Sequence, residues 1–460
     1  MEYELLKKTT CIAMSCLTLA CSADPAPPNQ AAPPPADVAR NANVYLQSLA
    51  SSGAFSGTVL LARDGQILFA KGYGYANEAE KTANSVTTRF SIASITKTFT
   101  ATLILKMQQR GLLTIEDPVC KHLAPCPLAW HDITVRHLLM HTSGIPDYAS
   151  GPDFLVRMRE PRPVEQIIAT FRDQPLQFRP GTKYQYSNSG YFLLGAVLEK
   201  AGGKPYPKLL DEIILQPLGM HDTRYGALPA AAIGYQPDGA DNAIADEVDT
   251  SWLYAAGGIY STVADLLKWE RALYTDALLP RADLAAMWAA DLGEYGYGWQ
   301  LLKPSKQTLN RFLVFHAGGT VGFSTDLLRY PAEGVTVIIL ANLHPVALAE
   351  VSRNLSAIVF GEPHAVPELR QAMKLDPAIY DAYVGEYQIN PALTLTVTRE
   401  RDKLAVQASG QAKDIAVPES RSTFYSRTSP VRLTFLEDSA GRVNRLVIHH
   451  ADGDITAMRE

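Results

Sequence analysis

Residues 90–100, with the sequence FSIASITKTFT, place Ser94 and Lys97 three positions apart at the start of an apolar-periodic run. The spacing of that run predicts a helix, so the two side chains share one helical face. A serine hydroxyl is a weak nucleophile until a neighbour takes its proton, and an amine whose pKa is lowered by its pocket can do so. Ser94 is therefore the candidate nucleophile and Lys97 its activating partner. Taken alone, however, the pair favours a structural interpretation, a helix-start serine beside an exposed lysine, and the other motifs have to change that balance.

A second group of polar residues lies between positions 178 and 200, where a Pro-Gly turn leads into Tyr-Ser-Asn and then into an apolar-faced helix. Tyr186 is a candidate base, because a phenol held near cations can lose its proton below its usual pKa of about 10. Asn188 can donate to a substrate carbonyl and accept from a lysine. A second Tyr-x-Asn copy at 75–77 follows a hairpin among glycines, and we interpret it as structural.

A third group, FHAGGTVGF at 315–323, follows an apolar strand. Its glycines, Gly318 and Gly319, let the backbone approach a ligand closely and point N–H groups at it. His316 stands beside them as a possible hydrogen-bonding group. Another histidine, His141 in MHTSG, is interpreted as structural, because HTSG is a helix exit with capping chemistry of its own.

The elements that must position these residues follow from the hydrophobic pattern. Two β-rich runs flank an Asp64-Gly65 turn, which is a strong hairpin signal, and further strands are predicted between 310 and 342. Loops at 147–175 and 235–255 are expected to supply pocket walls. After a polar link at 362–369 the pattern changes to short alternating strands, which predict a separate antiparallel β-domain over 370–460.

The N-terminus reads as an export signal over residues 1–20, where two lysines precede an apolar run too short to span a bilayer. The run ends LTLAC, which resembles a bacterial lipobox with Cys21 as the lipidated residue. Cleavage after Ala23 by an ordinary signal peptidase, or a cytosolic chain with a fortuitous run, are the alternatives. A Pro/Ala-rich segment at 21–40 is predicted to be an extended spacer, with a helix beginning near Val38.

Composition and motif content argue against several classes of function for this protein. The chain has 460 residues, 47% hydrophobic residues and a net charge of −5, which gives no reason to expect nucleic-acid binding. We find no phosphate loop and no metal-spaced His/Cys cluster, so neither a cofactor nor a metal is expected. Cys120 and Cys126 lie close together, and in an oxidising compartment they could form a disulfide; two free thiols are the alternative.

The order S-x-x-K, Y-x-N, H-x-G resembles the serine β-lactamase-related family, which contains class C β-lactamases, D-alanyl-D-alanine carboxypeptidases, D-aminopeptidases and related esterases. Stretches such as LLMHTSGIPDY, YSNSGYFLLGAVLEKAGG and YGYGW are similar too, over about 41–362. The C-terminal region resembles the lipocalin-like barrel of some members. The resemblance implies an α+β fold, in which an antiparallel sheet is flanked by helices and an all-helical half is inserted, followed by an antiparallel β-barrel.

Carried over by this resemblance, Ser94 is the acylated nucleophile, Lys97 and Tyr186 the proton-transfer pair, and Asn188 a group that orients substrate. How a lysine and a second base divide this work is disputed in related enzymes. The resemblance also implies an oxyanion hole made of the backbone N–H groups of Ser94 and Gly319.

One departure from the family pattern bears on substrate choice. β-Lactamases and D,D-peptidases usually carry Lys-Thr-Gly where this chain has His316-Ala317-Gly318. A neutral imidazole gives little attraction for a substrate carboxylate at pH 7. We therefore expect an exported serine hydrolase acting on esters or amides of small molecules or peptides. A β-lactamase or D,D-carboxypeptidase, and a non-catalytic penicillin-binding-like envelope protein, are the alternatives. A lipidated Cys21 would tether it to a membrane, and the oligomeric state is left open.

Overall fold

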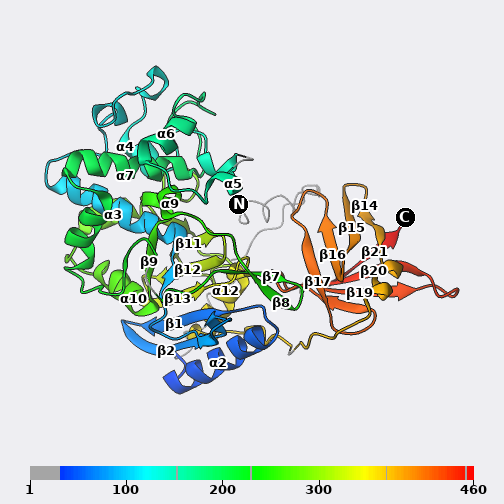
Figure 1. The fold of residues 1–460 in the computed structure, drawn as a ribbon. Helices are drawn as coiled ribbons and strands as arrows, with labels where there is room; N and C mark the ends of the chain where they lie inside the picture. Colours follow the sequence, from blue (N-terminus) through cyan, green and yellow to red (C-terminus); the bar gives the residue numbers. More distant parts are fainter. Residues whose placement is uncertain (1–31, 152–153, 228–229, 369, 451–452) are drawn as a thin grey trace, which may run out of the picture. The chain divides into compact units, whose positions relative to one another are not determined.

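The computed structural model describes residues 32–151, 154–227, 230–368, 370–450 and 453–460. The expected signal segment, Cys21 and most of the expected spacer lie outside the described residues. The rest of the chain belongs to one compact unit, Pro33–Glu460. Figure 1 shows its helices and strands in sequence colours.

The central element is an antiparallel sheet with the strand order β10-β11-β12-β13-β1-β2. The N-terminal hairpin thus shares one sheet with the strands of residues 300–341, because β1 pairs with β13, and this confirms the expected antiparallel sheet. Its turn residues Asp64 and Gly65 have φ values of 51° and 79°, which suit the right-handed twist of a tight hairpin. The strands are β1 Gly57–Arg63, β2 Gln66–Tyr73, β10 Gln300–Leu302, β11 Leu313–Thr320, β12 Phe323–Tyr330 and β13 Val335–Ala341.

The sheet is covered on both faces, because alternate side chains of its strands enter two different cores. In β1, Val59 and Leu61 pack with helices α2 (Pro35–Ser51) and α12 (Leu348–Phe360). Leu60 and Ala62 point the other way, into the larger core that holds the catalytic candidates' helices. Both strand faces are therefore apolar, and β12 and β13 are buried along their whole length.

A largely helical half lies between β2 and β10 in the sequence, and Figure 1 shows its helices gathered on one side of the sheet. It supplies most of the larger core. Its helices are α3 Thr96–Gln109, α4 Val135–Leu139, α5 Phe154–Arg157, α6 Val164–Arg172, α7 Asn188–Gly202, α8 Tyr206–Leu210, α9 Thr250–Gly257, α10 Val263–Ala272 and α11 Arg281–Met287. Shorter elements are β3 Tyr75–Asn77, β4 Thr82–Ala83, β5 Phe90–Ser91, β6 Arg224–Tyr225, β7 Tyr235–Asp238, β8 Asp241–Ile244, β9 Ile259–Ser261, and the turns η1 Ala93–Ile95, η2 Val119–Lys121, η3 Leu128–Trp130, η4 Tyr148–Ser150 and η5 Asp211–Leu215.

The C-terminal strands close into an antiparallel barrel, as expected for this region. Closure is made by β14 pairing with β21, where Tyr387 lies opposite Arg459. Aromatic side chains fill the interior, and the rings of Tyr383 and Phe435 stack with centroids 4.5 Å apart. The elements are η6 Pro377–Ala382, β14 Gly385–Asn390, β15 Leu393–Glu400, β16 Lys403–Ala408, β17 Asp414–Pro418, β18 Thr423–Tyr425, β19 Arg432–Glu437, β20 Val443–His450 and β21 Gly453–Arg459.

Two local features bear on the sequence-based expectations. Helix α2 begins at Pro35 rather than near Val38, so the last part of the expected spacer is helical. A proline is well suited to the first helical position, and Asp37 adds an acidic group to the first turn. Cys120 and Cys126 form a disulfide with their Cα atoms 5.4 Å apart.

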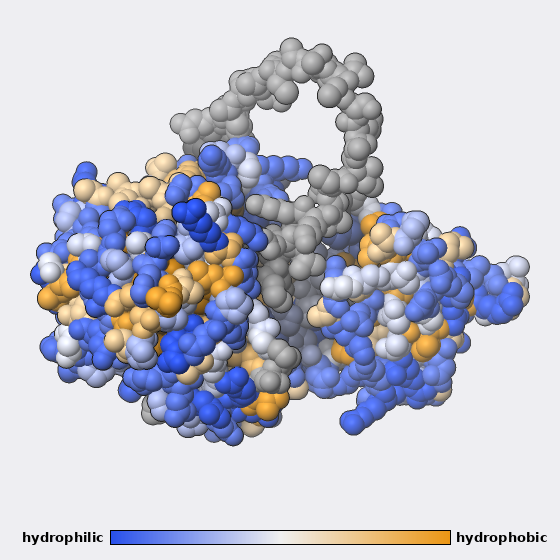
Figure 2. Space-filling view, turned by 90° about the horizontal axis from the view of Figure 1, so that it is seen from above, coloured by the Kyte–Doolittle hydropathy of each residue, from blue (hydrophilic) through white to orange (hydrophobic). Residues whose placement is uncertain are grey.

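Figure 2 shows a largely hydrophilic face with apolar residues in scattered groups. The large exposed apolar side chains come from separate elements, for example Leu128 in η3, Val156 in α5 and Ile244 in β8. Among the residues that the structure describes, no helix combines the length and apolarity needed to cross a bilayer.

Candidate active site

Ser94 lies in the short turn η1, which leads into α3. Ser94 is half-buried, whereas all the remaining residues between 90 and 100 are buried. The residue before it, Ala93, has a φ of 44°, a conformation that a residue with a Cβ rarely adopts. A main-chain hydrogen bond from the Ile92 N–H to the Ile259 carbonyl, 3.0 Å long, holds this sharp bend. The bend turns the serine hydroxyl out of an otherwise closed core.

Lys97 is fully buried, one helical turn from Ser94. Its Nζ lies 3.0 Å from Ser94 Oγ, 3.0 Å from Asn188 Oδ1 and 2.8 Å from the Ala256 carbonyl oxygen. Burial lowers the pKa of Lys97 to about 7, and the charge of Asp147 opposes that shift. An amine with such a pKa is neutral in a large fraction of molecules near neutral pH, which is the form that can accept a proton.

Tyr186 is hydrogen-bonded to Ser94, so the hydroxyl, the amine and the phenol meet at one point. The sequence-based expectation for its pKa is wrong. Burial raises the pKa of Tyr186 above its ordinary value, and the hydrogen bond with Ser94 only partly offsets this. Lys97 stands over the ring, with Nζ 5.0 Å from the centroid. Tyr186 is therefore a neutral phenol in the resting protein.

Asn188 is the first residue of α7, and its amide bridges two charged groups. Its Oδ1 accepts from Lys97, and its Nδ2 donates to Asp147 Oδ2 over 3.1 Å. The loop before the helix is held by His141, whose Nδ1 accepts from the Ser187 N–H over 3.1 Å. The ring of His141 lies 4.3 Å from that of Tyr186, centroid to centroid. The second Tyr-x-Asn copy lies instead on β3.

His316 lies on β11 and is only 1% exposed. Its Nδ1 is 2.7 Å from the Ala317 carbonyl and its Nε2 is 2.9 Å from the Tyr295 hydroxyl. Because a carbonyl only accepts, Nδ1 carries the proton and Nε2 accepts from the phenol. Burial, aided by the charge of Lys97, lowers the pKa of His316 to about 3. The ring is neutral as expected, but both nitrogens are engaged within the protein, so in this structure neither is left for a substrate.

Gly318 and Gly319 lie near the end of the same strand, β11, and differ in what surrounds them. A Cβ on Gly318 would lie 2.3 Å from Thr325 Oγ1 and 2.4 Å from the Ile92 carbonyl oxygen, so β11 packs against the segment before Ser94 only because this residue is glycine. A Cβ on Gly319 would meet only His344 Cε1, at 3.5 Å. Gly319 is exposed, as a residue offering its N–H to a ligand must be.

Sequence reasoning missed three contributors to the site. Asp147 begins the first segment expected to form a pocket wall, Ala256 follows directly after the second, and Tyr295 comes from the YGYGW stretch. A polar residue directly after the HTSGIP turn was the available signal for Asp147. The Ala256 contact carries no side-chain signal. It follows Tyr254, whose φ of 38° and ψ of −133° break the regular path of α9 and let the next carbonyls turn inward.

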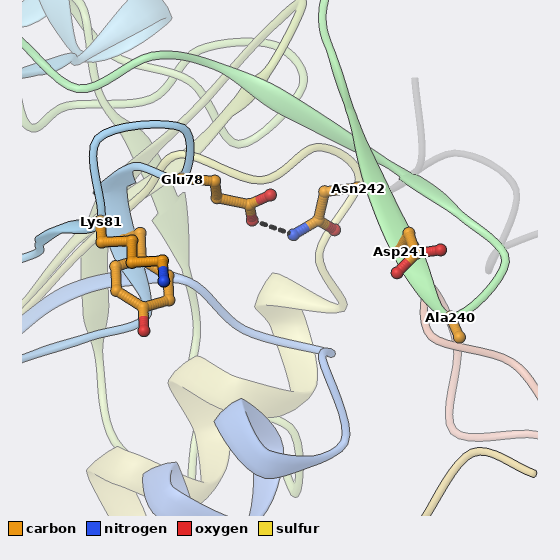
Figure 3. A pocket seen from close by; sticks show the side chains of 6 residues that line it. Glu78, Lys81, Ala240, Asp241 and Asn242 are labelled. Atoms are coloured by element: carbon orange, nitrogen blue, oxygen red, sulfur yellow. Dashed lines mark hydrogen bonds between the residues drawn. The ribbon is translucent and has the colours of Figure 1, made fainter.

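A surface cavity of about 560 Å³ lies elsewhere, between β3–β4 and β7–β8. Figure 3 shows Glu78 accepting from Asn242 across it. Its lining residues are Tyr75, Glu78, Lys81, Ala240, Asp241 and Asn242, none of which is a predicted site residue. Within the described ranges no group of three His, Cys, Asp or Glu is placed to hold a metal ion.

A half-buried serine in contact with a buried lysine and a tyrosine, set where an antiparallel sheet meets a helical half, is an arrangement suited to acyl transfer. Residues 41–358 match the Beta-lactamase family model, and the chain belongs to that family. Residues 369–459 match a domain of unknown function, DUF3471.

Penicillin-binding protein 4* of Bacillus subtilis is 31% identical over 438 residues, covering 87% of this chain and 95% of that protein. A D-stereospecific amidohydrolase from Streptomyces is 27% identical, with a TM-score of 0.59 and coverage of 72% of this chain and all of that one. The octameric penicillin-binding protein homologue from Pyrococcus abyssi shares the fold, with a TM-score of 0.64 over 91% of this chain and 99% of that one, at 23% identity.

Proposed function

We propose that this protein is an exported serine hydrolase that cleaves ester or amide bonds through an acyl-enzyme on Ser94. The observation that carries the proposal is the contact between a half-buried hydroxyl and a fully buried amine, with Ser94 Oγ 3.0 Å from Lys97 Nζ. The amine's pKa, lowered to about 7, fits a group that takes a proton at neutral pH.

In the proposed acylation step, Ser94 Oγ bonds to the substrate carbonyl carbon and its proton passes to the neutral Lys97. The backbone N–H groups of Ser94 and Gly319 stabilise the negative charge that develops on the carbonyl oxygen. As the tetrahedral intermediate collapses, the bond to the leaving alcohol or amine breaks. The proton then reaches that leaving atom from Lys97 through the phenol of Tyr186, which is neutral and already hydrogen-bonded to Ser94.

Deacylation reverses the roles of the same groups. Water adds to the acyl carbon while its proton passes through the phenol of Tyr186 to the neutral Lys97, and Ser94 leaves as that proton is returned to its oxygen. The products are a carboxylic acid and free enzyme, so each cycle consumes one substrate and one water. No redox partner or cofactor enters this balance.

The proposed substrates are esters, amides or peptides that lack an obligatory terminal carboxylate. The support is His316, which is neutral and engaged on both nitrogens where a cation would attract a carboxylate. The similarity to a D-stereospecific amidohydrolase favours amides of D-amino acids among these substrates. A β-lactamase or D,D-carboxypeptidase is the second candidate, favoured by the similarity to penicillin-binding protein 4*. A penicillin-binding-like envelope protein without turnover is the third.

Export to the cell envelope is part of the proposal. The lysines and apolar run of residues 1–20 support it, and so do relatives named as penicillin-binding proteins. Lipidation at Cys21, which would anchor the protein in the outer membrane facing the periplasm, is the preferred form; soluble secretion is the alternative. Palmitate labelling of cells, lost in Cys21→Ala but kept in Cys16→Ala, tests the anchor.

A fluorophosphonate probe tests the chemistry, because serine attack on phosphorus displaces fluoride and leaves a stable Oγ–P bond. We expect labelling of the wild type and of Ser52→Ala, a serine beyond the end of α2, and no labelling of Ser94→Ala. A hydrolysis panel of p-nitrophenyl esters, D-amino-acid amides, D-Ala-D-Ala peptides and nitrocefin then ranks the substrate classes. Labelling without turnover of any panel member would favour the envelope binding protein.

A further inference from the structure

The three groups that contact the Lys97 amine differ in whether they can donate a hydrogen bond to it. The Ala256 carbonyl and Asn188 Oδ1 only accept hydrogen bonds, whereas the Ser94 hydroxyl can also donate. A neutral amine has two N–H bonds and one lone pair. With both N–H bonds held by the obligate acceptors, the lone pair is left for Ser94. The amine is thereby aimed at the proton it has to remove.

This arrangement depends on which way the amide of Asn188 faces. If the amide turned over, its Nδ2 would face Lys97 and could donate to the lone pair in place of Ser94. The contact that fixes the orientation is with Asp147, since a carboxylate only accepts and Nδ2 lies 3.1 Å from Asp147 Oδ2. Asp147 is itself held by the Ala149 N–H, 3.1 Å from Oδ1, at the start of η4.

We propose that Asp147 is a positioning residue for acylation, which locks the Asn188 amide with Oδ1 toward Lys97 and so directs the lysine lone pair to Ser94. This inference rests on the proposed acylation of Ser94. Asp147 follows the HTSGIP turn and acts on the reaction through Asn188 and Lys97 rather than by contacting the serine.

The carboxylate has a second, electrostatic effect on the same amine. The charged and titratable groups that interact with Lys97 are Asp147, His316 and His141, together with the rings of Tyr186 and Tyr191. Burial lowers the pKa of His141 and of His316, so both imidazoles are neutral near pH 7. Burial raises the pKa of Tyr186 and of Tyr191, so both phenols are neutral as well. Asp147 is thus the group in this set whose negative charge raises the pKa of Lys97.

Two substitutions separate these effects. Asp147→Asn removes the charge but keeps an oxygen that can accept from Asn188 Nδ2. Asp147→Ala removes both the charge and the acceptor. Asp376 is a matched control, because it caps η6 in the barrel through the same contact, with its Oδ1 2.9 Å from the Ala378 N–H. The rate constant for inactivation by the fluorophosphonate probe is measured from about pH 5 to 9, per folded molecule as counted by circular dichroism.

The wild-type rate constant is expected to rise with pH through the titration of Lys97. Asp147→Asn should move this rise to lower pH and keep most of the plateau, because the amine loses a favourable charge but keeps its geometry. Asp147→Ala should also lower the plateau, by about 10- to 100-fold, because the amide is free to turn. Asp376→Asn and Asp376→Ala should match the wild type.

The outcomes distinguish this inference from the proposed function. Absence of labelling in the folded wild type overturns both. Labelling of the wild type with the same midpoint and plateau in both Asp147 variants overturns only the role of Asp147. Equal loss of folded protein in both variants, with unchanged rates for the folded fraction, assigns Asp147 to structure alone and overturns the inference as well.

Discussion

The Tyr295 phenol donates a buried hydrogen bond to His316 Nε2, with the two atoms 2.9 Å apart. The other ring nitrogen donates to the Ala317 carbonyl, so the imidazole is held in one tautomer. The position at which related enzymes usually present a lysine to the substrate is therefore occupied by a neutral ring tied into the fold.

The first prediction concerns substrates that differ only in a terminal carboxylate. The two substrates are N-acyl-D-alanyl esters whose leaving alcohol ends either in a free carboxylate or in the corresponding methyl amide. We expect kcat/KM for the carboxylate to be no higher than for the methyl amide, because His316 supplies no cation. A lysine at this position would attract the acid, and charge-assisted hydrogen bonds to carboxylates contribute about 1.5–3 kcal/mol. A preference for the acid of tenfold or more would contradict the prediction.

The second prediction is the pH dependence of acylation. The pKa of Lys97 is lowered to about 7, so the fraction of neutral amine, and with it kcat/KM for a p-nitrophenyl ester, rises as pH increases through that value. Lys97→Arg keeps a positive charge that cannot be removed at these pH values, and should lower kcat/KM by about 10²- to 10⁴-fold at every pH. An unchanged acid limb in Lys97→Arg would show that another group is the base.

Tyr186→Phe is the third test. Removing the phenol oxygen takes away the group hydrogen-bonded to Ser94, and we expect kcat/KM to fall by about 10²- to 10⁴-fold while the protein stays folded. The chain offers a matched control in its other Tyr-x-Asn copy, since Tyr75 lies on β3 and is 44% exposed. Tyr75→Phe should keep wild-type kinetics, and a similar loss in both variants would point away from a specific role for Tyr186.

The sequence motifs predict most residues of the candidate site, because side chains of distinctive chemistry at short spacing define it. Ser94 and Lys97 are neighbours on consecutive turns, so helical periodicity alone brings them together. The contact of Lys97 with Asn188 joins residues 91 positions apart and follows from the family resemblance rather than from spacing.

What could not be predicted depends on backbone geometry and burial. The Ala256 carbonyl is a main-chain group, and every residue has one. The sequence predicts a lowered pKa for Tyr186, because it shows the lysine but not the burial of the phenol. That burial raises the pKa instead. The engagement of His316 Nε2 depends on Tyr295, which lies 21 residues away on a different segment.

The fourth prediction compares two adjacent glycines. Gly318→Ala places a Cβ 2.3 Å from Thr325 Oγ1 and 2.4 Å from the Ile92 carbonyl oxygen, so β11 or the segment before Ser94 must shift. Such overpacking costs about 1–3 kcal/mol, and the labelling rate should fall as well. Gly319→Ala keeps its N–H and meets only His344 Cε1 at 3.5 Å, so urea unfolding should change little. Equal destabilisation by both substitutions would refute the close approach at Gly318.

The last prediction concerns Asp326, a buried residue of β12 that is not part of the candidate active site. It accepts a hydrogen bond from Ser352 Oγ on α12, 2.6 Å long. Burial raises its pKa from 3.8 to about 7, and the Ser352 hydrogen bond only partly opposes this. The folded protein therefore retains a proton that the unfolded chain releases. The stabilising contribution is complete below the unfolded pKa of about 4 and is lost as pH rises through about 7.

Asp326→Asn removes this titration, because an amide is uncharged at every pH. We expect the free energy of unfolding of the variant, relative to wild type, to increase by about 1–3 kcal/mol between about pH 4 and pH 8. Asp276→Asn, at an exposed position, should follow the wild-type pH dependence. Urea unfolding at the two pH values measures both differences. If Asp326→Asn and wild type lose stability in parallel over this range, the carboxyl group is not the one that binds the extra proton in the folded state.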